Sequence, residues 1–357
     1  MFLIGVALRD VFQGVIVPRA ENTVLRVSRY IMRGLWKIWP AIGEIVYRDA
    51  VDKNEDFLAT FAPFYLVTVQ AVWVVMLVFG WGLFFYGIRD QLHPQGMSFS
   101  DSVYFAGATL LTIGYGDIVP DGLLARGTSI LCAVSGLGVL AVVISFLFSI
   151  FAAFQQRERF VVTTGARAGV PPSGLGLLLV HAKAGIRADV AQVFRDAQDW
   201  TASVMESHLA YPVLIMFRSS HDYESWVGTL GTLMDAASLV ISTLDPNHLE
   251  NPNSRGQARI LYNLGRHLAH DFAAYFNQHA TVSQEAGIER FEFDAACEHL
   301  RAAGYVLRES DEAWPEFERL RSAYGPQLNA MARWLRTPPL QWIGDRSRIA
   351  RQKAHIG

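Results

Sequence analysis

The sequence predicts an all-α membrane protein: two spanning helices with a re-entrant helix between them, followed by an α-helical cytoplasmic domain. Residues 57–88 and 127–156 contain no Asp, Glu, Lys or Arg, and each exceeds the roughly 20 residues that a spanning helix needs. Between them lies a glycine-rich hexapeptide at residues 112–117. Beyond residue 177, apolar side chains recur at spacings of three and four, which is typical of amphipathic helices.

Composition supports a chain with a membrane part and a soluble part. The 357 residues leave room for about two domains, and the 51% hydrophobic content is concentrated in the first 160 residues. The net charge of −2 argues against a nucleic-acid partner, which would require a strongly basic domain. Cys132 and Cys297 show neither a disulfide framework nor the spacing of a metal site.

Residues 1–18 form an apolar segment interrupted by Arg9 and Asp10. At 1.5 Å per residue the segment barely crosses a hydrocarbon core of about 30 Å. Each charge at the bilayer centre costs about 2.5–3.5 kcal/mol, so in a spanning helix the pair must face protein, water or each other. A transmembrane helix and an interfacial helix both fit this segment.

Residues 19–56 are rich in Lys and Arg, and such short segments remain in the cytoplasm. Within them Val24, Val27, Ile31, Leu35 and Ile38 recur at helical spacing. We therefore expect an amphipathic helix lying on the inner leaflet, where its basic residues favour anionic lipids.

The uncharged segments and the residues between them predict two spanning helices with a short helix between them, which the resemblance described below identifies as a pore module over 57–158. The outer helix is predicted at 57–88 and the inner helix at 127–156. Between them, 101–111 predicts a pore helix capped by Ser100 or Asp101 and far too short to span. Such a helix enters the membrane partway and directs its negative C-terminal end at a cation.

The hexapeptide has the residues required to coordinate a dehydrated cation with backbone oxygens. Consecutive carbonyls can face one axis only if the backbone alternates with the left-handed region, which glycine adopts without a Cβ penalty. We expect the Tyr115 ring to point away from the axis and brace this segment, and the Asp117 carboxylate to concentrate cations at the outer mouth. The residues in question are Thr112, Ile113, Gly114, Tyr115, Gly116 and Asp117.

The order of outer helix, re-entrant helix, hexapeptide and inner helix resembles the pore module of the potassium channel superfamily. The motif reads Thr109-Leu-Leu-Thr-Ile-Gly-Tyr-Gly-Asp-Ile-Val-Pro120, with Leu111 where many members have threonine and Ile113 where valine is usual. The resemblance implies that residues 112–117 are a selectivity filter for K⁺. One filter per chain implies a homotetramer. The competing interpretation is an ordinary glycine turn between helices.

The resemblance also implies a gate on the inner helix. Gly136 and Gly138 are the candidate hinges, since inner helices of this superfamily splay at a glycine. Small residues that allow close helix packing are an equally good interpretation of both positions.

After the pore module we expect a linker at 159–176 and a helical cytoplasmic domain at 177–357. The linker is rich in Gly and Pro, yet no phosphate-binding motif follows it. His267, His270 and Asp271 share a helix face and are a weak candidate metal site; His221 and Asp294 are further possible ligands that no spacing supports.

The sequence thus predicts a passive potassium channel of the bacterial single-pore type. It needs no cofactor, since K⁺ is the permeant ion, and it is not an enzyme. We expect a multi-pass protein of the inner (plasma) membrane with its C-terminal domain in the cytoplasm, where that domain regulates the pore through an unknown ligand. The alternative is a membrane-tethered metal-binding enzyme or sensor in which the pore is secondary.

Overall fold

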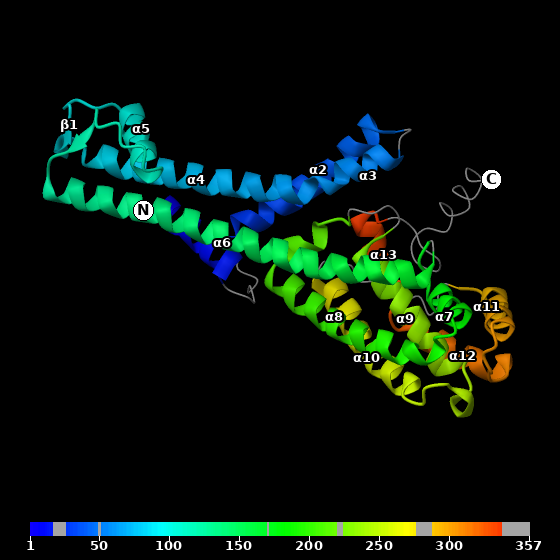
Figure 1. The fold of residues 1–357 in the computed structure, drawn as a ribbon. Coiled ribbons are helices and arrows are strands. Elements are labelled where there is room, and N and C mark those ends of the chain that lie inside the picture. The colour runs from blue at the N-terminus through cyan, green and yellow to red at the C-terminus, as the bar shows by residue number, and fades with distance from the viewer. Residues whose placement is uncertain (17–25, 49–50, 170, 220–223, 276–287, 338–357) are drawn as a thin grey trace. The chain divides into compact units, whose positions relative to one another are not determined.

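The structure is a computed structural model that describes residues 1–16, 26–48, 51–169, 171–219, 224–275 and 288–337. The chain divides into two compact units, which are described separately below (Figure 1). The first consists of Met1–Ala153 and Ser207–Phe217, and the second of Phe154–Glu206 and Arg218–Gly357.

Among the described residues of the first unit, all regular secondary structure is helical except for one short pair of strands. Two helical stretches of the described chain, Lys53–Gly87 and Leu123–Ala168, are long and apolar enough to cross a membrane. The elements of this unit are α1 (Phe2–Val11), the π-helical η1 (Phe12–Ile16), α2 (Val27–Val46), α3 (Val51–Ala59), α4 (Phe61–Gly87), η2 (Arg89–Gln91), β1 (Leu92–His93), α5 (Phe99–Leu110), β2 (Val119–Pro120), η4 (Pro212–Met216) and the first part of α6 (Leu123–Ala168).

Helices α4, α5 and α6 build the predicted pore module. The short α5 packs on α4, with the rings of Phe85 and Phe105 edge to face at 4.8 Å. The indole of Trp81 on α4 donates a hydrogen bond of 3.0 Å to the Ser135 hydroxyl on α6. Aromatic packing and a polar link therefore join the three helices where backbone hydrogen bonds cannot.

Helix α1 is attached to α4 through its buried carboxylate. Asp10 is fully buried and accepts hydrogen bonds from the Trp73 indole at 2.7 Å, the Ser28 amide at 3.0 Å and the Ser28 hydroxyl at 3.1 Å. Three donors offset the desolvation of one carboxylate. Asp10 thus faces protein, whereas Arg9 is exposed; whether residues 1–18 span the membrane stays a prediction.

Helix α2 lies within the predicted amphipathic stretch and packs on α3 and on the start of α4 through aromatic rings. Trp39 stacks on Phe57 at 4.9 Å and contacts Phe64 at 4.7 Å, while Trp36 meets Phe61 at 4.7 Å. Residues 19–25 and 49–50 of that stretch lie outside the described residues. Lipid binding by 19–56 therefore stays a prediction.

The segment Ser207–Phe217 belongs to the first unit although it follows a tail helix in sequence. Its short helix η4 packs against α4, and the Tyr211 ring meets Phe146 of α6 edge to face at 5.5 Å. Val213, Leu214, Ile215 and Met216 are all buried. This apolar cluster lies within the predicted tail domain, yet it forms part of the core around α4 and α6.

The inner helix is longer than predicted, and the linker is shorter. Helix α6 has 46 residues and continues to Ala168, so residues 159–168 are not a linker. Gly169, with φ of +83°, ends the helix in the left-handed conformation that glycine adopts at C-termini. Pro171 and Pro172 follow, where the chain cannot remain helical. The predicted linker began too early, because Thr163 and Gly165 are residue types common in linkers. An isolated Gly such as Gly165 is nevertheless tolerated inside a helix.

The second unit is a helical domain built around α9. Every residue of this helix is buried, and α7, α10, α12 and α13 pack around it. Its elements are the remainder of α6, α7 (Gly174–Lys183), η3 (Arg187–Asp189), most of α8 (Val190–Ala210), α9 (Trp226–Ser242), η5 (Pro246–His248), α10 (Ser254–Tyr275), α11 (Arg290–Ala302), α12 (Ser310–Ser322) and α13 (Gly325–Leu335).

A buried ion pair joins α9 to α12. The Asp235 carboxylate accepts a hydrogen bond from Arg321 Nε at 3.0 Å and another from the Tyr324 hydroxyl. Both charged side chains are at most 1% exposed. Burial is the main influence on Asp235 and raises the pKa of its carboxyl, while Arg321 opposes that effect.

Candidate ion-conduction site

The re-entrant helix α5 begins at a capping box. The Ser98 hydroxyl accepts a hydrogen bond from the Asp101 amide at 3.3 Å, and Asp101 Oδ2 accepts one from the Ser98 amide at 2.8 Å. The predicted caps, Ser100 and Asp101, are therefore wrong: Ser98 is the cap and Asp101 is the third helical residue. The pattern Ser-x-x-Asp is itself a capping-box signature, so the sequence contained this information.

The backbone of the hexapeptide alternates between conformations, as its residue types predict. Gly114 and Gly116 have φ of +63° and +80°, the region that glycine adopts without a Cβ penalty. Thr112 also has a positive φ, +54°, which its residue type does not predict. A non-glycine residue held there costs about 1–3 kcal/mol and marks a functional segment more often than a random one.

The inner end of the hexapeptide is anchored to the C-terminus of α5. The Ile113 amide donates a hydrogen bond of 2.8 Å to the Ala108 carbonyl, and the Thr112 amide donates one of 3.1 Å to Thr109. These bonds occupy carbonyls that a helix end otherwise leaves without partners. The segment therefore leaves the helix in a fixed direction.

Tyr115 braces the segment against α5. Its ring stacks on Tyr104 with centroids 6.4 Å apart and planes 5° from parallel. This contact is of the bracing kind that the sequence predicts for the Tyr115 ring.

The outer end of the hexapeptide is held by the two short strands. Antiparallel β1 and β2 pair Leu92 with Pro120 and His93 with Val119. The Asp121 amide adds a hydrogen bond of 2.9 Å to the Gln91 carbonyl. Hydrogen bonds to the preceding loop and to α5 therefore fix both ends of residues 112–117.

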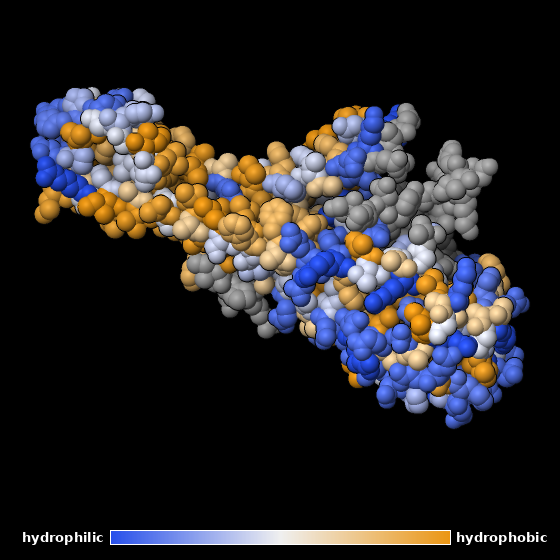
Figure 2. All heavy atoms as spheres, in the orientation of Figure 1, coloured by the Kyte–Doolittle hydropathy of each residue, from blue (hydrophilic) through white to orange (hydrophobic). Residues whose placement is uncertain are grey.

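Residues 111–117 are all exposed in the single chain. Ile113 is 49% exposed and Tyr115 69%, unusual values for large apolar side chains at the centre of a packed module. Apolar residues also gather over the visible surface of α4 and α6 (Figure 2). On α6 the most exposed large apolar residues include Leu123, Ile130, Leu131, Val134, Leu137 and Phe148.

The two candidate hinges have different surroundings. A Cβ at Gly136 would lie 2.1 Å from the Leu110 carbonyl oxygen, at the C-terminus of α5. No atom lies within 4 Å of the corresponding position at Gly138. The absent side chain of Gly136 therefore allows α6 to pass close beneath α5, which favours packing over bending at this position.

The candidate metal ligands of the tail form exposed ion pairs. His267 Nε2 lies 3.3 Å from Asp271 Oδ2, and His270 Nδ1 lies 3.9 Å from Asp271 Oδ1. Within the described part of the chain, no group of three or more His, Cys, Asp or Glu side chains is arranged to hold a metal. Asp294 binds Arg290 and Ser310 instead, and His221 lies outside the described residues. The metal interpretation therefore lacks structural support.

Comparison with known proteins relates the region around the hexapeptide to ion channels. Residues 71–153 match a family described as "Ion channel". The chain is 22% identical over 212 residues to the uncharacterized membrane protein YdjJ of Bacillus subtilis. This alignment covers 57% of this chain and 61% of YdjJ. It is 30% identical over 89 residues to the calcium-gated potassium channel TvoK of Thermoplasma volcanium, or 24% of this chain and 26% of TvoK.

A third relative, potassium voltage-gated channel subfamily A member 2 of Xenopus laevis, is 31% identical over 74 residues, or 21% of this chain and 15% of that protein. Each alignment thus spans less than two thirds of the relative's length. No solved structure matches the chain.

The matched residues include α5, the whole hexapeptide and the part of α6 that lies in the first unit. Most of α4 belongs to the same match, and both long helices have the length and composition of membrane spans. The chain is an all-α membrane protein with an ion channel domain at residues 71–153, and this region is similar to parts of two potassium channels.

Proposed function

We propose that the chain forms a homotetrameric, K⁺-selective channel in which residues 112–117 of four copies surround the conduction path. The observation that carries this proposal is the alternation of φ at Thr112, Gly114 and Gly116. Such alternation turns successive carbonyls toward one side of the strand, where they replace the hydration shell of K⁺. Some related non-selective channels lack the filter tyrosine, whereas this chain has Tyr115, which supports selectivity for K⁺ over general cation conduction.

The exposed apolar residues support assembly. The sequence contains the hexapeptide once. A closed ring of carbonyls requires four such strands, so four copies of the chain are needed. Ile113 and Tyr115 are exposed in the single chain, so neighbouring copies around an axis would bury them. Lipid and the neighbouring copies would together cover the remaining apolar surface of α6.

The charges flanking the spans support an orientation. The basic residues of 19–56 precede α4, and Arg157 and Arg159 follow the uncharged part of α6. Cytoplasmic segments carry this excess of Lys and Arg. In this orientation the second unit is cytoplasmic, Thr112 faces the cell interior and Asp117 faces outside. We further propose that the second unit regulates the pore.

Flux into proteoliposomes tests conduction and selectivity. The purified full chain should support uptake driven by a K⁺ gradient and much less uptake when Na⁺ replaces K⁺. Gly114→Asp should abolish the K⁺ flux because it places a side chain at a φ of +63°, and Tyr115→Ala should reduce selectivity because it removes the stack on Tyr104. Native mass spectrometry should give the mass of four chains. Persistent K⁺ flux in both variants, or a dimer, would refute the proposal.

A further inference from the structure

A cavity of about 140 Å³ lies within the second unit. It is bounded by the C-terminal end of α9, the start of α10 and the loop at 304–306. Ligand pockets for drug-sized molecules usually measure about 300–1,000 Å³. This cavity therefore suits a ligand much smaller than a nucleotide.

One wall of the cavity is aliphatic. Val240 lies near the end of α9, and Leu244 follows that helix. Both are at most 2% exposed, and they line the cavity together with Leu178 and Val306. None of these side chains has a polar atom. This wall therefore suits a short branched hydrocarbon group.

Another part of the lining carries opposite charges side by side. Arg187 Nε lies 2.7 Å from Glu250 Oε1, and Arg187 Nη1 donates a hydrogen bond of 2.6 Å to the Gly304 carbonyl. The guanidinium also lies 5.4 Å from the centre of the Tyr305 ring. These contacts fix a cation and an anion at the edge of a small apolar space.

Three polar groups of the lining retain hydrogen-bonding capacity. Ser254 is only 4% exposed, yet its hydroxyl has no partner among the described residues. Within the same described ranges, Nη2 of Arg187 and Oε2 of Glu250 also have none. The Ser254 hydroxyl therefore lies in the lining beside the charge pair, available to a polar group of a ligand.

The cavity walls are held by independent contacts. The Tyr305 hydroxyl donates a hydrogen bond of 2.9 Å to the Leu178 carbonyl, and the Asp245 amide donates one of 3.0 Å to Val306. Burial raises the pKa of Tyr305 to about 12, so its phenol remains a neutral donor at physiological pH.

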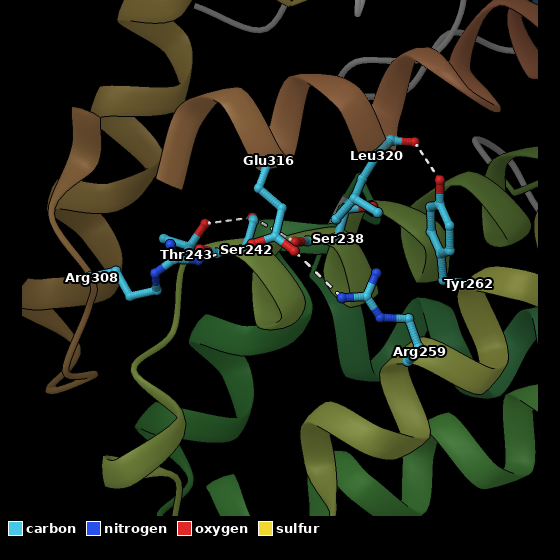
Figure 3. Close-up of polar contacts among 8 residues, drawn as sticks. All are labelled: Ser238, Ser242, Thr243, Arg259, Tyr262, Arg308, Glu316 and Leu320. Carbon is cyan, nitrogen blue, oxygen red and sulfur yellow. Dashed lines mark hydrogen bonds and ion pairs between the residues drawn. The ribbon is translucent and has the colours of Figure 1, made fainter. Parts of the chain in front are cut away.

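Beside the loop, Figure 3 shows the Glu316 carboxylate between two arginines, with Arg308 Nη1 at 2.9 Å and Arg259 Nη2 at 3.4 Å. Arg308 also donates a hydrogen bond of 3.0 Å to the Ser242 carbonyl at the end of α9. The wall at 304–308 is therefore fixed against α9 and α12 before any ligand arrives.

We propose that this cavity binds a free aliphatic α-amino acid. Arg187 Nη2 and the Ser254 hydroxyl bind the carboxylate, and Glu250 Oε2 accepts a hydrogen bond from the ammonium group. The branched side chain of the ligand packs on Val240 and Leu244. A zwitterion with an aliphatic side chain is the small molecule that matches the charge pair and the apolar wall at once.

Calorimetric titration of the full chain in detergent tests the proposal with three probes of one carbon skeleton. L-Leucine carries both charges, 4-methylpentanoate lacks the ammonium, and 3-methylbutylamine lacks the carboxylate. We expect leucine to bind, and each single-charge probe to bind about tenfold more weakly or worse because one charge-assisted hydrogen bond is lost. Absence of leucine binding, or equal binding of a single-charge probe, would overturn the proposal.

Variants locate the site. Glu250→Gln and Ser254→Ala should each weaken leucine binding by about tenfold, and Glu298→Gln, at an exposed position on α11, is the matched control and should leave it unchanged. Thermal unfolding without ligand shows whether each variant is folded. If folded Glu250→Gln and Ser254→Ala bind leucine like the wild type, this cavity is not the site. Binding requires no ion flux, so its failure would leave the proposed pore untouched.

Discussion

The two units of this protein place their exposed and buried groups in opposite ways. In the first, the segment with the most distinctive sequence, residues 112–117, is exposed in the single chain, and apolar side chains cover much of α4 and α6 (Figure 2). In the second, the central helix α9 is fully buried and hydrophilic residues prevail on the visible surface (Figure 2). The first unit thus leaves apolar surface uncovered in the single chain, whereas the second has its own core.

This difference explains why the sequence indicates one function and not the other. The proposed filter acts through backbone carbonyls, so its requirements appear as glycines at fixed spacing. A pocket in the second unit acts through side chains from several segments, and those segments come together only in the fold. Function that depends on backbone conformation leaves a local sequence signature, and function that depends on convergent side chains does not.

The largest effect is expected at the filter. Gly116→Ala should abolish K⁺ flux, because a Cβ at φ of +80° costs about 1–2 kcal/mol in each chain and displaces the adjoining carbonyls. Thermal unfolding of the second unit should not change. Flux into proteoliposomes measures the first effect and intrinsic fluorescence the second.

The control for this prediction is Gly127→Ala, at a helical position of α6 with no atom within 4 Å of the added Cβ. It should retain flux. Equal loss in both variants would show that the membrane unit tolerates no added methyl group, and the backbone explanation would fail.

The next effect concerns the core of the second unit. Arg321→Met should lower its free energy of unfolding by about 3–5 kcal/mol, because Asp235 is left as a buried charge without its partner. Urea unfolding followed by tryptophan fluorescence measures this change. Adding Asp235→Asn should recover part of the loss, and no recovery would mean that Arg321 contributes through packing alone.

A smaller effect separates the two glycines of α6. Gly136→Ala should lower the thermal stability of the channel, since overpacking against the Leu110 carbonyl costs about 1–3 kcal/mol, and should reduce K⁺ flux. Gly138→Ala has open space and should match the wild type in stability. If Gly138→Ala alone alters flux, bending at Gly138 rather than packing at Gly136 controls the pore.

The smallest expected effect is a loss of folding stability at acidic pH. The Asn247 amide and the His248 side chain hold the pKa of Asp245 below its ordinary value of 3.8. The folded state therefore binds this proton less readily than the unfolded state, and the stabilisation is present above pH 3.8 and lost as the pH falls through the lowered pKa. Asp245→Asn should unfold thermally with a weaker dependence on pH below 3.8, and an unchanged pH profile would contradict this.

Much of the pore module could be predicted from the sequence, and the misses have identifiable causes. The two long segments without charged residues predicted α4 and α6. The glycine spacing predicted the left-handed conformation of Gly114 and Gly116. The cap at Ser98 was missed although its capping-box pattern was present. The end of α6 was placed too early because glycine is a helix breaker and Gly165 suggested that the helix had already ended. The helix continues past Gly165 and ends at Ala168, before Gly169.

Other features required the fold. Asp10 and Trp73 are 63 positions apart, and nothing local to either residue indicates the pairing. Thr112 adopts a positive φ because the hydrogen bonds of the α5 C-terminus fix the chain around it. Burial of η4 in the first unit depends likewise on α4 and α6, which its own sequence does not specify.

The burial of α9 has a consequence for measurement. An amide in a helix with no exposed residue exchanges with solvent only when the surrounding helices separate, so its exchange rate reports the global opening of the domain. Val240, at the end of this helix, lines the cavity of the second unit. Deuterium uptake by α9 would therefore report the stability of the second unit inside the intact, membrane-embedded protein, and would slow in the presence of any ligand that stabilises this unit, whatever the chemistry of that ligand.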